Sequence, residues 1–311
     1  MKGKSEFQTN HILGFKWAQI SEKAWFEPTI RLFDPEKESI KTHPLKNDSI
    51  NWKLSDEQFC TGYHDIESYV SCPAQRSVTK MTTYCQCYSC EKAQGFKEGF
   101  LFDGELNEIT RQYLSQKHYI YLAYFQPGKI KVGTTSESRK FKRLLEQDAR
   151  IFTYIAEASG LEIKALERAI SKKNHHITES FTSSQKLKTI SDPIDIGIGE
   201  KTLRDSIKDI LKRLGDHEIY EKWFYPEENI EIYFQDKLSK IYFPPRNYSL
   251  VEEPEHLSGK FLGFRGRYLF LENNGVPFIF DTKNLIGRKI EGESIHNYAV
   301  NIPGSQMKLE I

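Results

Sequence analysis

The stretch H-Y-I-Y-L-A-Y-F (residues 118–125), followed by K-I-K-V-G-T-T (residues 129–135), carries the clearest fold signal in the chain. In the first run, tyrosines alternate with aliphatic residues, which is typical of a β-strand, and Pro127-Gly128 lies where a turn is needed. The second run is the expected returning strand. The sequence therefore predicts a β-hairpin near the middle of the chain.

Helices are predicted after this hairpin. Thr134 and Glu137 fit a capping box in front of a first helix, and Ser159 and Glu162 repeat that signal in front of a second one. Apolar residues then recur at helical spacing over residues 202–214 and predict a third helix. A hairpin followed by helices indicates an α+β fold for this part of the chain.

The second predicted helix carries Glu167 within the run A-L-E-R-A-I (residues 165–170). Successive helical residues advance by about 100°, so Glu167 lies within about 40° of Ile163 and shares its apolar face. A carboxylate on that face needs a cation, an arginine or several hydrogen bonds to compensate its charge. The sequence therefore places a compensated acidic group toward the interior of the domain or a cleft.

Composition divides the chain into four segments. Residues 1–56 contain short aromatic and β-branched runs between turn residues, which predicts an N-terminal β unit. Residues 57–110 hold the cysteines and have little apolar periodicity, and residues 111–245 form the α/β domain. Residues 246–311 contain strands with glycine breaks and an Asn-Asn-Gly turn at 273–275, which predicts a small antiparallel β unit.

The overall composition is that of a soluble globular protein. In 311 residues, 38% are hydrophobic, and 44 Lys and Arg nearly balance 43 Asp and Glu. No apolar run approaches the ~18 residues of a membrane span, and the N-terminus lacks the apolar core of a signal peptide. We therefore expect a cytoplasmic location and no membrane partner. Any nucleic-acid surface must come from local segregation of charge.

All five cysteines fall within one short region, and an odd number in a reducing compartment argues against disulfides. The C-x-x-C spacing at residues 87–90 lets two thiolates grip one tetrahedral ion, and two earlier cysteines can supply a second pair. The predicted ligands of a structural zinc ion are Cys60, Cys72, Cys87 and Cys90. Cys85 and His64 are reserve ligands. Buried reduced cysteines without metal are the alternative, which the polar surroundings disfavour.

The central stretch resembles the GIY-YIG nuclease superfamily and, more closely, the family known as domain of unknown function 2797, through its H-x-x-Y-L-A, K-V-G-x-T and Q-x-A runs. The resemblance implies phosphodiester hydrolysis with a catalytic Mg²⁺ or Mn²⁺ ion. Glu167 matches the glutamate that binds this metal, and Tyr121 matches the tyrosine that orients or deprotonates the nucleophile. The arginine that clamps the scissile phosphate falls on Arg143, or on Arg139 if the preceding loop is shorter.

Two positions depart from the superfamily pattern. Lys131 stands where a tyrosine normally helps to activate the attacking water, and Gln147 stands where the superfamily often has histidine or tyrosine. Tyr119, on the same strand face as Tyr121, could substitute, as could His118. Each residue also has a structural interpretation, as a strand aromatic, a solvated arginine or the partner of an internal ion pair.

Positive charge is concentrated in two places. The first group borders the predicted cleft, where phosphates would lie, and the second lies beside the aromatic residues Phe261, Phe264 and Tyr268, a combination used to stack bases. The first group is Lys129, Lys131, Arg139, Lys140, Lys142 and Arg143, and the second is Lys260, Arg265 and Arg267. The same alternation of charge and aromatics is also typical of a half-buried strand.

These observations lead to one principal hypothesis and two alternatives. The principal hypothesis is a zinc-containing nucleic-acid-binding protein with a GIY-YIG-like domain, with RNA favoured over DNA, whose enzyme version is a metal-dependent nuclease acting on structured RNA or DNA. The alternatives are a catalytically degenerate RNA- or tRNA-binding protein and a protein-interaction scaffold. Acidic residues around Tyr121 and Glu167 would favour the scaffold.

Overall fold

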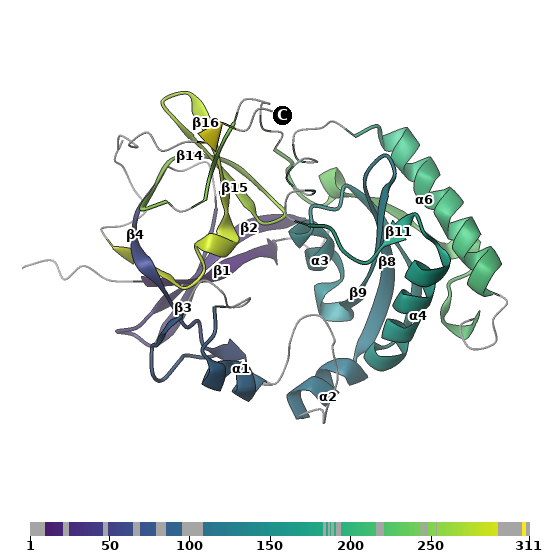
Figure 1. The fold of residues 1–311 in the computed structure, drawn as a ribbon, viewed down its shortest axis with the longest axis horizontal. Helices are drawn as coiled ribbons and strands as arrows, with labels where there is room; N and C mark the ends of the chain where they lie inside the picture. The colour runs from purple at the N-terminus through teal and green to yellow at the C-terminus, as the bar shows by residue number, and fades with distance from the viewer. Residues whose placement is uncertain are drawn as a thin grey trace, which may run out of the picture. The chain divides into compact units, whose positions relative to one another are not determined.

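The computed structural model describes residues 10–20, 25–45, 49–64, 69–78, 85–94, 108–182, 185, 187, 190, 194–215, 221–242, 244, 248–252, 254–291 and 307–308. The chain forms two compact units. Residues Met1–Phe96 and Pro244–Ile311 form the flanking unit, and residues Lys97–Phe243 form the central unit. Both contain a sheet, and the predicted α+β class, mostly sheet with few helices, is confirmed (Figure 1). None of the helices in the described ranges has the length and apolar character that a membrane crossing requires.

An 11-stranded sheet builds the flanking unit, in the order β18-β13-β16-β15-β14-β4-β17-β1-β2-β3, with β7 paired to β4. Its first strands are β1 (Asn10–Gln19), β2 (Phe26–Asp34), β3 (Ser39–Pro44), β4 (Ser49–Phe59) and β7 (Ser77–Val78). The later strands are β13 (Ser249–Val251), β14 (His256–Arg265), β15 (Tyr268–Asn273), β16 (Val276–Asp281), β17 (Arg288–Glu291) and β18 (Met307–Lys308). A small second sheet pairs β5 (Tyr63–His64) with β6 (Tyr69–Val70), and helix α1 spans Tyr88–Gln94.

This sheet joins the two ends of the chain. Strand β4 pairs with β14 in an antiparallel ladder, and β17 lies between β1 and β4. The structure thus differs from the predicted division, in which residues 1–56 and 246–311 were separate β units. The difference has a physical cause: period-2 alternation identifies a strand and its buried face, but a strand's unpaired N–H and C=O groups can be satisfied by any partner edge.

The turn between β15 and β16 follows the prediction from the Asn-Asn-Gly sequence. Asn273 pairs with Val276 across a two-residue loop, and the loop residues Asn274 and Gly275 have φ of 51° and 76°. Positive φ at both loop positions is what a type I′ turn requires, and Asn-Gly adopts it with little strain. The confirmed turn fixes the register of the hairpin.

The central unit contains a five-stranded sheet in the order β11-β9-β8-β10-β12. Its strands are β8 (Lys117–Gln126), β9 (Lys129–Ser136), β10 (Ile151–Ser159), β11 (Ile177–Thr178) and β12 (Ile232–Phe234). Its helices are α2 (Glu108–Ser115), α3 (Lys140–Glu146), α4 (Gly160–Lys173) and α6 (Ile196–Ile210). Strands β8 and β9 form the predicted hairpin, with Gly128 at φ 73° in the turn.

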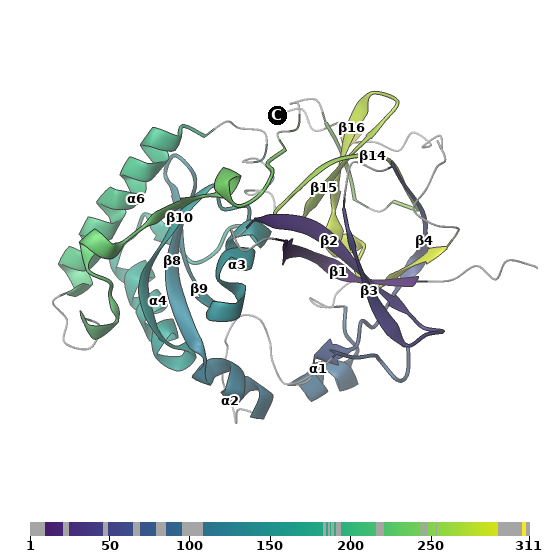
Figure 2. The ribbon, with the colours of Figure 1, turned by 180° about the vertical axis from the view of Figure 1, so that it is seen from behind.

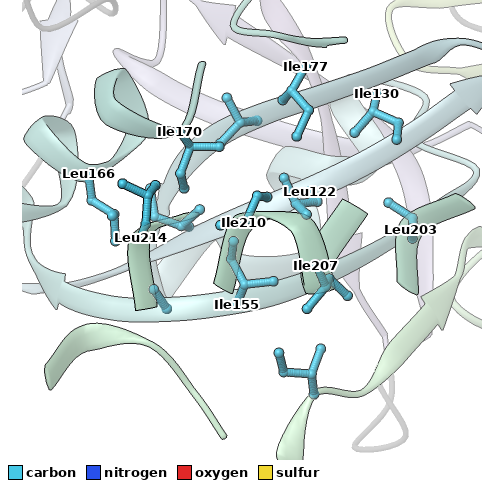
Figure 3. Close-up of a cluster of buried hydrophobic side chains, with 14 of the residues drawn as sticks. Leu122, Ile130, Ile155, Leu166, Ile170, Ile177, Leu203, Ile207, Ile210 and Leu214 are labelled. Carbon is cyan, nitrogen blue, oxygen red and sulfur yellow. The ribbon is translucent and has the colours of Figure 1, made fainter. Parts of the chain in front are cut away.

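Helices cover both faces of this sheet. Figures 1 and 2 show α4 and α6 on one side of β8 and β9, and α3 on the other. The side covered by α4 and α6 is an apolar core, in which the predicted stripe residues of both helices are buried (Figure 3). The labelled members are Leu122, Ile130, Ile155, Leu166, Ile170, Ile177, Leu203, Ile207, Ile210 and Leu214. The side covered by α3 holds the network of Tyr121, Lys131 and Gln147 described below.

The helix starts were predicted with mixed success. The capping box of Ser159 and Glu162 is confirmed, because the Ser159 side chain accepts from the Glu162 N–H group and the Ser159 N–H group donates to the Glu162 carboxylate at 3.4 Å. The capping box of Thr134 and Glu137 is wrong, because β9 continues to Ser136 and a single 3₁₀ turn precedes α3. Pairing of Thr134 with β8 satisfies its backbone groups in the sheet instead.

Candidate functional site

The cysteines of the flanking unit form a compact cluster. The Sγ atoms of Cys60, Cys72, Cys87 and Cys90, hereafter the Cys cluster, all lie within 4.8 Å of one another. Cys60 follows β4, Cys72 follows β6, Cys87 immediately precedes α1, and Cys90 lies in the first turn of α1. These four thiols, which are the four predicted ligands, could hold a metal ion such as zinc.

Backbone donors surround these thiols. The N–H group of Cys87 donates to Cys60 Sγ at 3.1 Å, and the N–H group of Gly62 donates to the same sulfur. Gly62 has φ of 72°, and a Cβ there would lie 2.2 Å from the carbonyl oxygen of Val70. Hydrogen bonds of this kind favour the thiolate, which is the form that binds metal. The loop geometry thus favours the thiolate form of the predicted ligands.

Burial of the thiols acts against the thiolate form. It raises the pKa of Cys60 and Cys90, whereas N–H donors from Arg76 and Ala74, together with neighbouring thiols, outweigh burial at Cys72 and lower its pKa. A cation at the centre would lower all of these pKa values, because it stabilises the thiolates directly. Metal binding and proton release are therefore coupled here.

Cys85 lies outside the Cys cluster. Its buried thiol donates to the carbonyl oxygen of Phe59 at 3.3 Å, and burial raises its pKa. The side chain of His64, the other reserve ligand, lies outside the described part of the structure. Among the described residues, the metal-binding arrangement is thus the predicted set of four.

A buried polar network lies on the α3 side of the central sheet. Gln147 Nε2 donates to the Tyr121 hydroxyl at 2.8 Å, and Lys131 Nζ donates to Gln147 Oε1 at 2.8 Å. All three residues are buried: Tyr121 is 1% exposed, Gln147 is 4% exposed and Lys131 is 9% exposed. Gln147, which appeared in the sequence as a departure from the superfamily pattern, therefore connects the hairpin tyrosine with the hairpin lysine.

Arg143 and Glu167 complete this group. The Arg143 side chain hydrogen-bonds the Tyr121 hydroxyl, and the charge of Glu167 acts on both Tyr121 and Lys131. The Glu167 carboxylate forms an ion pair with Lys164, one helical turn earlier. We call Tyr121, Lys131, Arg143, Lys164, Gln147 and Glu167 the Tyr121 cluster. The sequence missed Lys164, although its i,i+3 spacing to Glu167 is the pattern of a helical ion pair.

Gly133 explains how Tyr121 fits beneath this network. The two residues are directly opposite in the β8–β9 ladder, and a Cβ at Gly133 would lie 2.2 Å from the Tyr121 hydroxyl oxygen. We expected Gly133 to leave room for a phosphate or another backbone segment. In the structure the phenol ring of Tyr121 fills that space, so the glycine serves the packing of the tyrosine.

Burial dominates the electrostatics of the Tyr121 cluster. It lowers the pKa of Lys131 to about 8, with Arg143 adding to the effect and Glu167 opposing it. It also raises the pKa of Glu167, against the ion pair with Lys164, and raises the pKa of Tyr121. Each charged form is therefore held at a cost.

A family model described as protein of unknown function (DUF2797) matches residues 48–290 of the chain. The chain belongs to this family. The match includes both the Cys cluster and the Tyr121 cluster. A search of curated proteins and a search of solved structures each gave no match.

In this DUF2797 chain, Tyr119 and Tyr121 have different hydrogen-bond partners. The two tyrosines share a sheet face, as predicted, but Tyr119 donates its hydroxyl proton to Glu137 at 2.9 Å. Lys140 Nζ lies 4.5 Å from the Tyr119 ring centroid and 4.7 Å from that of Tyr154. Burial and the contact with Glu137 raise the pKa of Tyr119. Tyr119 and Lys140 thus form a separate aromatic and cationic group.

The first predicted phosphate-binding surface is partly occupied by internal contacts. Arg139 forms an ion pair with Glu146 at 2.6 Å, and Lys140 lies between the two tyrosine rings. Lys129 and Lys142 are half-buried on β9 and α3. The residues of this surface that lie within the Tyr121 cluster are Lys131 and Arg143.

The second predicted surface needs correction in this DUF2797 chain. Arg265 is 0% exposed, and Arg267 forms an ion pair with Asp281 at 2.6 Å. The three aromatic residues proposed to stack bases are buried, and Phe264 packs against Trp17 of β1 with ring centroids 5.7 Å apart. The half-buried strand was the correct interpretation, because β1 covers the face that a nucleic acid would need.

Proposed function

We propose that this protein binds nucleic acid through phosphate contacts at the Tyr121 cluster, while the Cys cluster holds a structural zinc ion. The observation that carries the proposal is the group of charges at the buried Lys131, on which Arg143, Lys164 and the carboxylate of Glu167 act. An excess of cationic donors beside a tyrosine hydroxyl suits a phosphate group, which accepts several charge-assisted hydrogen bonds.

Neighbouring charge supports this assignment. Lys129 on β9 and Lys142 on α3 belong to the same elements as Lys131 and Arg143 and are half-buried. They can contact further phosphates of a chain whose first phosphate lies at the cluster. The preference for RNA rested on the cysteine segment and on the terminal β unit, and only the cysteine segment remains, because the terminal strands bury their aromatic residues.

The scaffold alternative is the weaker proposal. Acidic residues around Tyr121 and Glu167 would favour it. The charged residues that act on these two side chains are the cations Lys131, Arg143 and Lys164 and the acidic residues Glu167 and Glu179. A cationic environment favours a polyanionic partner over a protein partner of unspecified charge.

Metal-dependent cleavage is the second candidate function, and a specific observation favours it. Tyr121, Arg143 and Glu167, the three positions matched to the superfamily, belong to one cluster in the structure. In this version Glu167 would hold a Mg²⁺ or Mn²⁺ ion, which would supply Lewis-acid chemistry, while Arg143 would hold the phosphate and Tyr121 would orient the water. Binding remains the leading proposal, because Lys164 already pairs with the Glu167 carboxylate.

Equilibrium binding across a salt series tests the leading proposal. About three phosphate contacts predict roughly a 20- to 40-fold loss of affinity between about 50 and about 200 mM salt. We expect Arg143→Ala to weaken binding of RNA and DNA by about tenfold or more. The matched control is Arg204→Ala, which removes an exposed arginine from an ion pair with Glu200 on α6. An affinity that does not change with salt concentration, or an equal loss of affinity in both variants, would contradict the proposal.

Cleavage is tested separately with Mg²⁺ or Mn²⁺ and labelled RNA and DNA. If the enzyme version holds, Glu167→Gln abolishes cleavage while leaving salt-dependent binding in place. Intact substrates after incubation of the wild-type protein with either ion would remove the enzyme version and leave the binding version alone.

A further inference from the structure

Tyr88 is the most exposed large hydrophobic residue in the described part of the chain. It is 77% exposed, whereas the central-sheet tyrosines Tyr119, Tyr121 and Tyr154 are at most 4% exposed. An exposed ring gains almost no stabilisation from its own chain, because that stabilisation is proportional to the apolar area removed from water. The ring of Tyr88 is therefore open to contact with another molecule.

The Cys cluster fixes the position of Tyr88. The residue lies between Cys87 and Cys90, two of the predicted zinc ligands, in the run C-Y-S-C. Cys87 donates its N–H group to Cys60 Sγ at 3.1 Å, and its carbonyl oxygen accepts from the N–H group of Glu91 at 2.9 Å. A side chain on an ordered backbone loses little conformational freedom on binding, which favours affinity. Tyr88 is therefore a preorganised contact.

An exposed cation lies beside this ring on α1. Tyr88 and Lys92 are four residues apart, which places them on the same face of the helix, and both are exposed. Cys90 lies about 200° from Tyr88 around the helix axis and is buried, so the ring points away from the Cys cluster. Glu91, the acidic residue of α1, is half-buried on the other side of the ring from Lys92. The exposed charge next to the ring is thus positive.

A second exposed cation follows another predicted ligand. The N–H groups of Ala74 and Arg76 donate to Cys72 Sγ, and Arg76 is exposed. Cys72 Sγ lies 3.9 Å from Cys87 Sγ, so the loop that carries Arg76 and the helix that begins at Tyr88 meet at the Cys cluster. An aromatic ring with lysine and arginine on this surface has electrostatic complementarity to a polyanion that carries flat groups.

We propose that Tyr88 stacks against an unpaired base of a single-stranded nucleic acid, while Lys92 and Arg76 contact phosphates next to that base. This inference rests on the proposed function for the class of partner, and it adds a second contact surface that selects single strands. A base stacks on the exposed face of a flat ring and needs no cavity. A base within a duplex is already paired and stacked, so it reaches the tyrosine only at the cost of unstacking.

Stacking of this kind predicts a preference for single strands rather than for a sequence. Every base has a π face, so all four bases can stack on a tyrosine. The phosphates that Lys92 and Arg76 contact are the same in every sequence. We expect single strands of different sequence to bind with similar affinity, and a duplex to bind more weakly.

Three matched RNA ligands test the inference with the whole chain in its zinc-loaded form. They are an unstructured single strand, the same strand annealed to its complement, and a strand of equal length in which abasic sites replace the bases. The abasic strand keeps the phosphates but lacks the groups that stack. We expect the single strand to bind about tenfold more tightly than the abasic strand or the duplex, since loss of one base–aromatic contact costs about that factor.

Substitutions of Tyr88 separate stacking from simple apolar contact. Tyr88→Ala should weaken binding of the single strand by about tenfold and leave binding of the abasic strand unchanged. Tyr88→Trp keeps a flat aromatic ring and should retain the affinity, whereas Tyr88→Leu keeps an apolar side chain without a ring and should bind as weakly as Tyr88→Ala.

A matched control removes another exposed hydrophobic side chain. Leu161 of α4 is 58% exposed, and Leu161→Ala should leave the affinity for all three ligands unchanged. Metal content and thermal unfolding of Tyr88→Ala should match those of the wild type, because the ring is hardly buried. A loss of affinity in that variant then reports the lost contact and not a lost fold.

The outcomes distinguish this inference from the proposed function. If Tyr88→Ala binds the single strand as tightly as the wild type and Arg143→Ala binds it less tightly, the inference is overturned and phosphate binding at the Tyr121 cluster stands. If only Tyr88→Ala weakens binding, the inference stands and the assignment of nucleic-acid binding to the Tyr121 cluster is overturned. Full affinity of Tyr88→Leu, or an equal loss for the abasic strand, overturns the inference. Absence of binding to all three ligands overturns both.

Discussion

The Cys cluster and the Tyr121 cluster use buried ionisable groups in opposite ways. The Cys cluster gathers four like groups, with Sγ atoms within 4.8 Å, in a segment that has few apolar residues of its own. The Tyr121 cluster combines cations, a carboxylate and neutral groups beside a sheet whose other face is a continuous apolar core. We therefore expect the first region to need a bound metal ion in order to fold, whereas the second is packed against an apolar core.

This difference predicts opposite signs for the effect of mutation on stability. Removing a metal ligand removes free energy that the flanking unit depends on, because metal binding contributes directly to folding. Removing the charge of Lys131 removes a buried ammonium whose desolvation opposes folding. A residue whose loss stabilises the protein but impairs binding is a residue kept for function.

The largest expected effect is loss of the metal from the flanking unit. We expect Cys87→Ser, or treatment with a strong chelator, to remove the bound zinc and to unfold the cysteine segment. Structural zinc contributes on the order of 10 kcal/mol to the folding of small metal-binding domains, so the loss is severe. Metal content by elemental analysis, and hydrogen exchange of residues 60–94, measure the two consequences.

Cys85→Ser is the matched control for this experiment. Cys85 is buried in the same region, but its thiol bonds to Phe59 and lies outside the Cys cluster. The Cys85→Ser variant should keep its metal and most of its stability. A protein purified without metal, or equal metal loss in both variants, would contradict the assignment of the ligands.

The second effect is a gain in stability at neutral pH for Lys131→Met. Each pKa unit corresponds to about 1.4 kcal/mol, so the reduction from 10.5 to about 8 in the folded chain corresponds to about 3 kcal/mol. Between these two values the unfolded chain binds a proton that the folded chain has released, so wild-type stability increases with pH across this window. The variant lacks this increase.

Chemical denaturation of both proteins between about pH 7 and about pH 10 measures this linkage. A wild-type stability that is constant or decreases over this range would show that Lys131 keeps an ordinary pKa. Loss of stability in the variant at pH 7 would show that the ammonium is well compensated.

The smallest of the three effects concerns Gly133. Gly133→Ala places a methyl group 2.2 Å from the Tyr121 hydroxyl oxygen, so the phenol ring must move. Overpacking of this kind costs about 1–3 kcal/mol, and displacement of Tyr121 also breaks its bond to Gln147. The temperature of thermal unfolding and the affinity for ligand should both decrease.

Gly197→Ala provides the control for that substitution. Gly197 lies in helix α6, where the nearest atom to an added Cβ is Asp195 Oδ1 at 3.4 Å. Alanine is favoured over glycine in a helix by about 1 kcal/mol, so this variant should gain stability. If both glycine variants behave alike, the close approach of Tyr121 does not matter.

The sequence alone determined the features that depend on local spacing. Alternation in residues 118–125 predicted strand β8, the Ser159–Glu162 cap predicted the beginning of α4, and the face of that helix placed Glu167 in the interior. The four cysteines that could hold a metal ion were also predicted, since C-x-x-C geometry is local and the remaining candidates were few. Membership of the DUF2797 family was indicated by the H-x-x-Y-L-A, K-V-G-x-T and Q-x-A runs and is confirmed by the family model.

Only the tertiary structure decided which groups meet. Local patterns could not show that β4 pairs with β14, that Arg265 is buried, or that Gln147 joins Tyr121 to Lys131. Strand pairing and charge compensation depend on contacts between residues far apart in the chain. A side chain that is exposed in one arrangement of strands becomes buried in another, so its partners and its charge state are properties of the folded chain as a whole.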